Sequence, residues 1–209
     1  MVAWRTASAA NPPARYRGES YWARPVPGFG DPTARLLVVG LAPAAHGGNR
    51  TGRVFTGDRS GDWLYRALYR AGFANQPLAV NRQDGLQLAD CYIAAAVRCA
   101  PPDNKPLPEE KRTCLPYLVR EMRALRRLEV LVALGSIAWE AALAALRENG
   151  VEIGAPRPRF GHGARVTLGR FQLVGCYHPS PQNTQTGRLS EEALDELFAG
   201  VARLLAGRT

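Results

Sequence analysis

Four short apolar runs divide the chain, and each leads into a segment that contains glycine or polar residues. They cover residues 36–41, 92–97, 130–135 and 171–176. Runs of this length with no polar alternation are typical of strands that are buried on both faces of a parallel sheet. The loops at the carboxyl ends of such strands are the natural place for a functional site.

Helical periodicity fills the segments between these runs. The predicted helices cover residues 60–71, 108–127, 136–149 and a closing amphipathic segment from residue 190 onward. Gly72 is expected to end the first of them, and Pro116 is tolerated inside the second. Ser136 and Ser190 are expected to be N-caps. Strands that alternate with helices predict an α/β fold with helices on both faces of a parallel sheet.

The first 34 residues are rich in proline, glycine and arginine, which disfavours long regular elements. We expect them to form an extended arm packed on the remainder. With 209 residues and 46% hydrophobic content, the chain is long enough for one substantial core and short for two. A single domain over residues 1–209 is therefore expected.

Basic residues outnumber acidic ones by 27 to 18, which gives a net charge of +9. Such a balance favours a polyanionic partner such as nucleic acid, although a GC-rich genome produces arginine-rich proteins as well. No segment reaches the roughly 18 apolar residues of a membrane span, and the opening residues lack the apolar core of a secretory signal. We expect a cytoplasmic protein with no membrane contact.

Two loops carry the candidate chemistry. The first, residues 40–58, contains five glycines, which let backbone amides approach a ligand closely. Loops of this kind also bind phosphates in mononucleotide enzymes, but neither standard nucleotide fingerprint is present. The second loop, residues 178–188, is stiffened by two prolines. A stiff loop with small polar groups suits a wedge pressed into the DNA minor groove, with Ser180 on phosphates.

Together these loops resemble those of the family 5 uracil-DNA glycosylases, the UdgB type of bacteria and archaea. The resemblance also includes residues 2–5, 17–32 and 97–106, so it covers essentially the whole chain. It implies a three-layer α/β/α domain around a four-stranded parallel sheet. It also implies a base excision repair enzyme that flips uracil, and some deaminated purines such as hypoxanthine or xanthine, out of DNA and hydrolyses the N-glycosidic bond.

The resemblance assigns roles to four residues. Asp58 resembles the catalytic carboxylate that orients water or stabilises positive charge on the sugar; alternatively it caps the next helix. Phe55 resembles the aromatic residue on which the flipped base stacks, or is a core phenylalanine. Asn104 resembles the active-site asparagine, or is a turn residue. His178 resembles the histidine that donates a hydrogen bond to the departing base.

Other residues of the two loops are expected to contact the substrate. These are Gly40, Ala42, Pro43, His46, Ser180, Asn183 and Arg188. A loop histidine that stabilises the turn is an equal alternative for His46. His162 belongs to no motif.

The family binds a [4Fe–4S] cluster through four cysteines, two in an amino-terminal C-x-x-C and two that match Cys99 and Cys114. The resemblance begins at Val2, where that first segment should have just ended, so Met1 is expected to be a late start or a truncation. Two thiolates are half of the usual ligand set, and we expect no cluster in the chain as given. Cys91 and Cys176 are expected to be core residues.

Two other classes of function stay open on the sequence alone. A nucleotide or phosphate-ester hydrolase requires a metal-binding carboxylate cluster, which Asp58 and Asp62 do not supply convincingly. A non-catalytic DNA-binding relative would have altered catalytic positions, whereas Asp58, Asn104 and His178 are all present. We expect a glycosylase without a catalytic metal, which acts as a monomer, preferably on double-stranded DNA.

Overall fold

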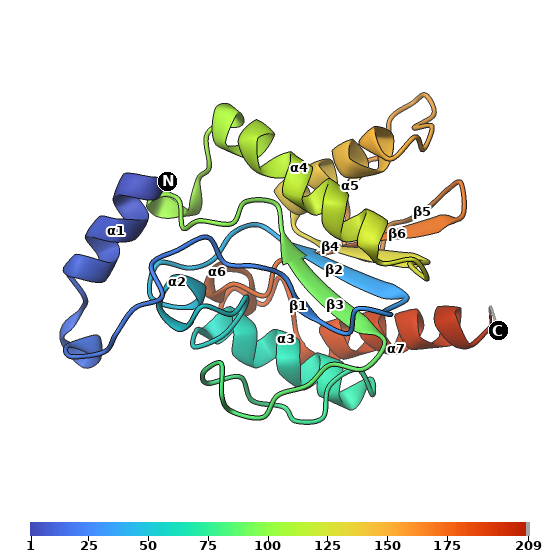
Figure 1. Ribbon diagram of the computed structural model, residues 1–209. Coiled ribbons are helices and arrows are strands. Elements are labelled where there is room, and N and C mark those ends of the chain that lie inside the picture. Colours follow the sequence, from blue (N-terminus) through green and yellow to red (C-terminus); the bar gives the residue numbers. More distant parts are fainter. Residues whose placement is uncertain (208–209) are drawn as a thin grey trace.

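A six-stranded sheet with the order β1-β3-β2-β4-β6-β5 forms the centre of the molecule (Figure 1). The computed structural model describes residues 1–207. The four inner strands are parallel and the two outer strands run antiparallel to their neighbours. The strands are β1 (Phe29–Gly30), β2 (Leu36–Gly40), β3 (Cys91–Ala95), β4 (Val130–Leu134), β5 (Arg165–Leu168) and β6 (Phe171–Cys176).

Helices cover both faces of this sheet and complete a three-layer α/β/α arrangement (Figure 1). The helices α3 (Arg59–Arg70) and α7 (Glu191–Ala206) pack together on one face. The helices α4 (Pro108–Ala124) and α5 (Ser136–Glu148) pack together on the other. The shorter helices are α1 (Val2–Ala10), α2 (Gly48–Thr51) and α6 (Pro181–Thr184), with 3-10 turns at Ala14–Tyr16 and Pro102–Asn104.

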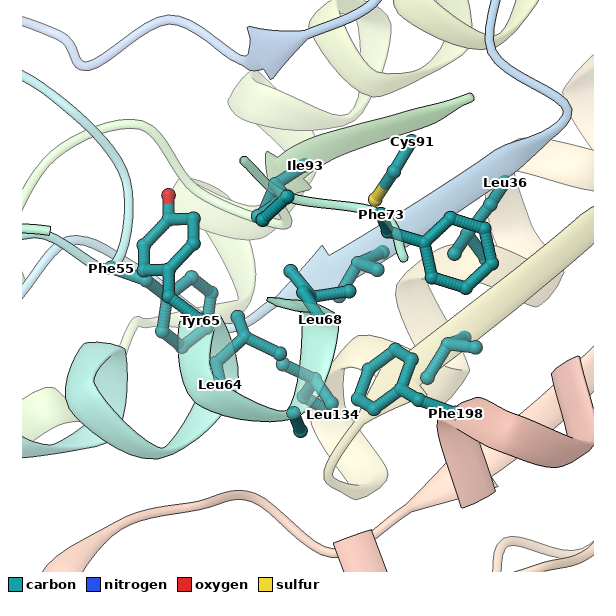
Figure 2. Packing of buried hydrophobic residues seen from close by; sticks show 14 of the residues in the cluster. Leu36, Phe55, Leu64, Tyr65, Leu68, Phe73, Cys91, Ile93, Leu134 and Phe198 are labelled. Atoms are coloured by element: carbon teal, nitrogen blue, oxygen red, sulfur yellow. The ribbon is translucent and has the colours of Figure 1, made fainter. Parts of the chain in front are cut away.

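The apolar side chains of the inner strands alternate between the two faces and build two cores. In β2, Leu36 and Val38 face the helix pair α3 and α7, whereas Leu37 and Val39 face α4 and α5. Figure 2 shows the first core, in which Phe198 of α7 lies close to leucines of α3 and of the strands. Because the inner strands are covered on both sides, their sequences are apolar throughout rather than alternating.

The predicted architecture is confirmed, with two additions. The four parallel strands lie where the apolar runs predicted them, within two residues at each end. The edge strands β1 and β5 were not predicted, since they are short and half exposed. Cys91 and Cys176 are buried core residues, as expected.

Two local predictions were wrong. Residues 1–34 are not extended throughout, because Val2–Ala10 form α1, an alanine-rich helix whose sequence contains neither proline nor glycine. Ser136 is the first residue of α5 and not its cap; Gly135, with φ +94°, occupies the N-cap position. By contrast, the Ser190 hydroxyl caps α7 by accepting the N–H of Ala193. Within residues 1–207, none of the helices combines the length and apolar character of a membrane span.

Candidate active site

The loop that follows β2 brings Phe55 against the end of the strand. Gly40 is the last residue of β2, and a Cβ atom there would lie 2.6 Å from the Phe55 ring. Only glycine therefore lets the ring approach the strand this closely. Phe55 is buried and has a left-handed backbone with φ +51°, which is uncommon for a bulky side chain. Strained residues of this kind concentrate at functional sites.

Asp58 closes the same loop and begins α3. Its Oδ1 accepts the backbone N–H of Gly61 at 3.0 Å, so the side chain is the N-cap of the helix. On its other side the carboxylate lies against Gly47, where any Cβ atom would collide with Oδ2. Burial raises the pKa of Asp58 above its ordinary value, while the Gly61 N–H and the Arg50 cation oppose this rise. The cap and the candidate catalytic carboxylate are thus one group.

His178 enters the site from the opposite side, directly after β6. Its ring centroid lies 5.8 Å from that of Phe55, with 33° between the planes. Burial lowers the pKa of His178 to about 4, so the imidazole is neutral at physiological pH. Within residues 1–207 its ring nitrogens have no hydrogen-bond partner, which leaves an N–H donor for a ligand.

Asn104 lies in the segment that follows β3 and is exposed. This segment starts beside the first loop, because the N–H of Ala96 donates to Gly40 O and that of Val97 to Leu41 O. Asn104 has φ +56° in a 3-10 turn. Among the described residues its side chain contacts neither Asp58 nor His178, so the structure does not bring it together with them.

Residues of the second loop mostly stabilise the loop itself. The Asn183 amide donates to the carbonyl of His178 at 2.8 Å, which fixes the backbone at that histidine. Ser180 precedes α6 and its carbonyl accepts the N–H groups of Asn183 and Thr184. Arg188 is exposed, with its guanidinium 4.5 Å from the centroid of the Tyr177 ring. A solvent-facing cation at this edge is available to a phosphate.

His46 is held by the amino-terminal arm. Its Nδ1 lies 2.9 Å from the Tyr21 hydroxyl, and its ring also contacts that of Tyr16. Burial, followed by the cations Arg15 and Arg50, lowers its pKa. Ala42 and Pro43 lie in the loop between His46 and Gly40, and Pro43 packs against Gly48.

A buried ion pair that was not predicted braces the first loop. Both terminal nitrogens of Arg53 bond the carboxylate of Asp84, at 2.9 and 2.6 Å, and Arg53 Nε donates to the Thr56 hydroxyl. Burial disfavours the charge on Asp84, but the hydrogen bonds from Arg53 and from three backbone N–H groups together outweigh it and lower its pKa to about 2. The sequence shows Arg53 as one of several polar residues in this loop and does not indicate its partner, which lies 31 residues later.

Comparison with known proteins decides the family. The profile described as "Uracil DNA glycosylase superfamily" matches residues 27–202, which include both loops and the whole sheet. The chain belongs to the uracil-DNA glycosylase superfamily. The matched range includes the sheet and helices on both of its faces, whereas α1 lies outside it (Figure 1).

Similar curated proteins place the chain in the type-5 group of this superfamily. A type-5 uracil-DNA glycosylase of Mycobacterium bovis is 51% identical in an alignment of 209 positions, which covers 99% of this chain and 76% of the relative. That of Mycobacterium leprae is 49% identical over 99% of this chain and 89% of the relative. That of Thermus thermophilus is 51% identical over 98% of this chain and 90% of the relative.

The two cysteines for which the resemblance implies cluster binding lie close together. Cys99 and Cys114 are buried, burial raises the pKa of Cys114, and the nearby Cys99 thiol acts in the same direction. Arg5 Nη1 donates to the Cys99 sulfur at 2.8 Å. In residues 1–207 there is no group of three or more metal-ligating side chains. The residues described here therefore do not fit a complete [4Fe–4S] site, which needs four thiolates.

Proposed function

We propose that this type-5 uracil-DNA glycosylase hydrolyses the N-glycosidic bond of uracil in double-stranded DNA, and of hypoxanthine or xanthine as well. The names of its relatives support uracil as the substrate base. The observation that carries the proposal is the placement of Asp58, Phe55 and His178 at the carboxyl edge of the parallel strands. A carboxylate, an aromatic face and a neutral imidazole are the groups that this reaction requires.

Phe55 is the proposed platform for the extruded base. Its ring lies against the backbone of Gly40 and near the ring of His178, and its burial keeps it ordered before the base arrives. Stacking on an aromatic ring contributes about 1–3 kcal/mol per base. This contribution offsets part of the cost of unpairing and unstacking the nucleotide.

Asp58 and His178 then act on opposite ends of the breaking bond. As the bond between C1′ and the base nitrogen lengthens, its electron pair stays with the base and the sugar becomes oxocarbenium-like. The Asp58 carboxylate stabilises the sugar cation and orients the water that adds to C1′, while the proton of the water passes to Asp58 or solvent. The His178 N–H donates to an oxygen of the departing base.

Asn104, Ser180 and Arg188 are assigned to substrate contact. The amide of Asn104 offers both a donor and an acceptor for a pyrimidine edge or the attacking water. Ser180 and the exposed Arg188 are assigned to phosphates, in agreement with the net charge of +9.

Asp58→Asn tests the proposal because it removes the charge and keeps an oxygen acceptor for the helix cap. We expect excision from a duplex with one uracil opposite guanine, in the presence of a chelator, to fall on the order of 10²–10³-fold. The melting temperature should stay near that of the wild type. Strand breaks after alkali treatment measure excision.

Ser190→Ala is the matched control, since it removes the N-cap of α7 and none of the groups assigned to the reaction. It should cost about 1 kcal/mol of stability and leave excision unchanged. Wild-type protein that binds the duplex and releases no uracil would identify a binding protein instead. Release of inorganic phosphate that the chelator abolishes would identify a metal-dependent hydrolase.

A further inference from the structure

Arg50 connects the amino-terminal arm to two points of the first loop. Its Nε donates to the carbonyl of His46 at 2.8 Å, and its Nη2 to the carbonyl of Gly57 at 3.3 Å. Its Nη1 forms an ion pair with Glu19 at 2.6 Å. The guanidinium carbon also lies 4.1 Å from the centroid of the Tyr16 ring.

These contacts fix the guanidinium in one place. Its side chain is 13% exposed, whereas that of Glu19 is 45% exposed. Hydrogen bonds in three directions and a ring against the guanidinium leave few alternative rotamers, and Arg is suited to such sites because its planar fork is preorganised. An ammonium group in its place could not reproduce the forked contact with two carbonyls and a carboxylate.

One of the two carbonyls that accept hydrogen bonds from Arg50 belongs to Gly57, the residue before Asp58. The peptide that leads into the carboxylate is thereby tied to α2, while Oδ1 is tied to α3 through Gly61. The charged and titratable groups that act on Asp58 are Asp62 of α3, which opposes its ionisation, and Arg50 of α2, which favours it. Among the described residues, Tyr65 of α3 also interacts with Asp58, and it is neutral because burial raises its pKa.

We infer that Arg50 is a positioning residue for the proposed reaction: it holds the Gly57–Asp58 peptide in place and sets a positive charge beside the Asp58 carboxylate. Glu19, on the outer side of the guanidinium, neutralises part of that charge, so it limits the repulsion between Arg50 and the cationic sugar. The inference rests on the proposed glycosylase function.

The pH dependence of single-turnover excision tests this role, with the enzyme in excess over a uracil duplex. In Arg50→Gln we expect the acid limb of the profile to move to higher pH, because the carboxylate loses its cation. Arg50→Lys should restore most of that shift but less of the rate. Glu19→Gln should move the acid limb to lower pH.

Arg15→Gln is the matched control. Arg15 packs on the same Tyr16 ring, at 4.8 Å, and among the described residues it bonds neither His46 nor Gly57. The acid limb of the Arg15→Gln profile should coincide with that of the wild type. An Arg50→Gln profile that is lowered equally at every pH, with the limb unmoved, would overturn the inference and reduce Arg50 to a structural residue.

Failure of the proposed function would look different, since the wild type itself would then release no uracil at any pH. If Arg50→Gln melts below the assay temperature, the pH profile of Glu19→Gln alone tests the role of Arg50. A limb shifted to lower pH supports the inference, and an unmoved limb overturns it.

Discussion

At Asp58 the interpretation as a helix cap and the interpretation as a catalytic carboxylate describe the same side chain. The sequence motif pointed to both, and the structure shows the cap directly. A buried carboxylate that receives N–H groups from its own helix is rigid, and rigidity is what a group that orients water requires. The two interpretations therefore support each other, and only a variant that separates charge from capping tells them apart.

His178 carries a prediction at this scale. Because burial lowers its pKa to about 4, its ring should stay neutral from pH 8 down to about pH 5. NMR titration of ring-labelled histidine, with His178→Gln to assign the signal, should show a flat response over that range. A midpoint near 6.5 would contradict both the burial and the proposed role as a neutral donor.

The same shift predicts a dependence of stability on pH. The unfolded chain takes up a proton at His178 near pH 6.5, whereas the folded protein does so near pH 4. The contribution of this residue to stability is therefore present above pH 6.5 and is lost as pH falls toward 4. The unfolding free energy of His178→Gln should fall less steeply with acid than that of the wild type.

At the scale of elements, the inner strands were predictable and the edges were not. A strand buried on both faces has an apolar run such as 130–134, which periodicity detects. The strand β1 has two residues and β5 has an exposed, polar pattern, so their identity comes from pairing with β3 and β6. Likewise, α1 is held by contacts that no local pattern encodes.

The Arg53–Asp84 pair gives a prediction for the loop as a unit. Asp84→Asn leaves the Arg53 cation buried without its counter-ion, and we expect a loss of about 3 kcal/mol in the free energy of unfolding. Glu140→Gln, in the half-exposed pair with Arg157, should cost about 0.5 kcal/mol or less. Chemical denaturation measures both, and equal losses would refute the bracing role.

Acid should weaken the same brace over a defined range. The pKa of Asp84 lies at about 2 in the folded protein, below its ordinary value. Its contribution is present above the ordinary value near pH 4 and is lost as pH falls toward 2. The wild type and Asp84→Asn should thus approach one another in stability only at strongly acid pH.

At the scale of the whole molecule, the excess of nine positive charges favours binding to the negatively charged DNA backbone. With Asp58→Asn, which binds without turnover, affinity for a duplex should fall on the order of 100-fold between about 50 and 200 mM salt, as for roughly four phosphate contacts. Fluorescence anisotropy measures this. An affinity that does not change with salt concentration would show that binding does not depend on phosphate contacts.

The site as a whole was less predictable than the residues that compose it. Family motifs pointed to Asp58, Phe55 and His178, but their convergence depends on strands that are separated by about 130 residues and lie close together in the sheet. Arg50 and Arg53 escaped notice because their roles come from partners in distant segments, Glu19 and Asp84. No local pattern reports such pairs.

The docking of α1 has a consequence for the order of assembly on the ribosome. Arg5 bonds Asn49 and Cys99, so the partners of this helix are made 44 and 94 residues later. A nine-residue helix is marginal by itself. At about 5–20 residues per second it must wait on the order of 5–20 seconds for its full docking surface. During synthesis, the segment translated early is therefore among the late ones to settle.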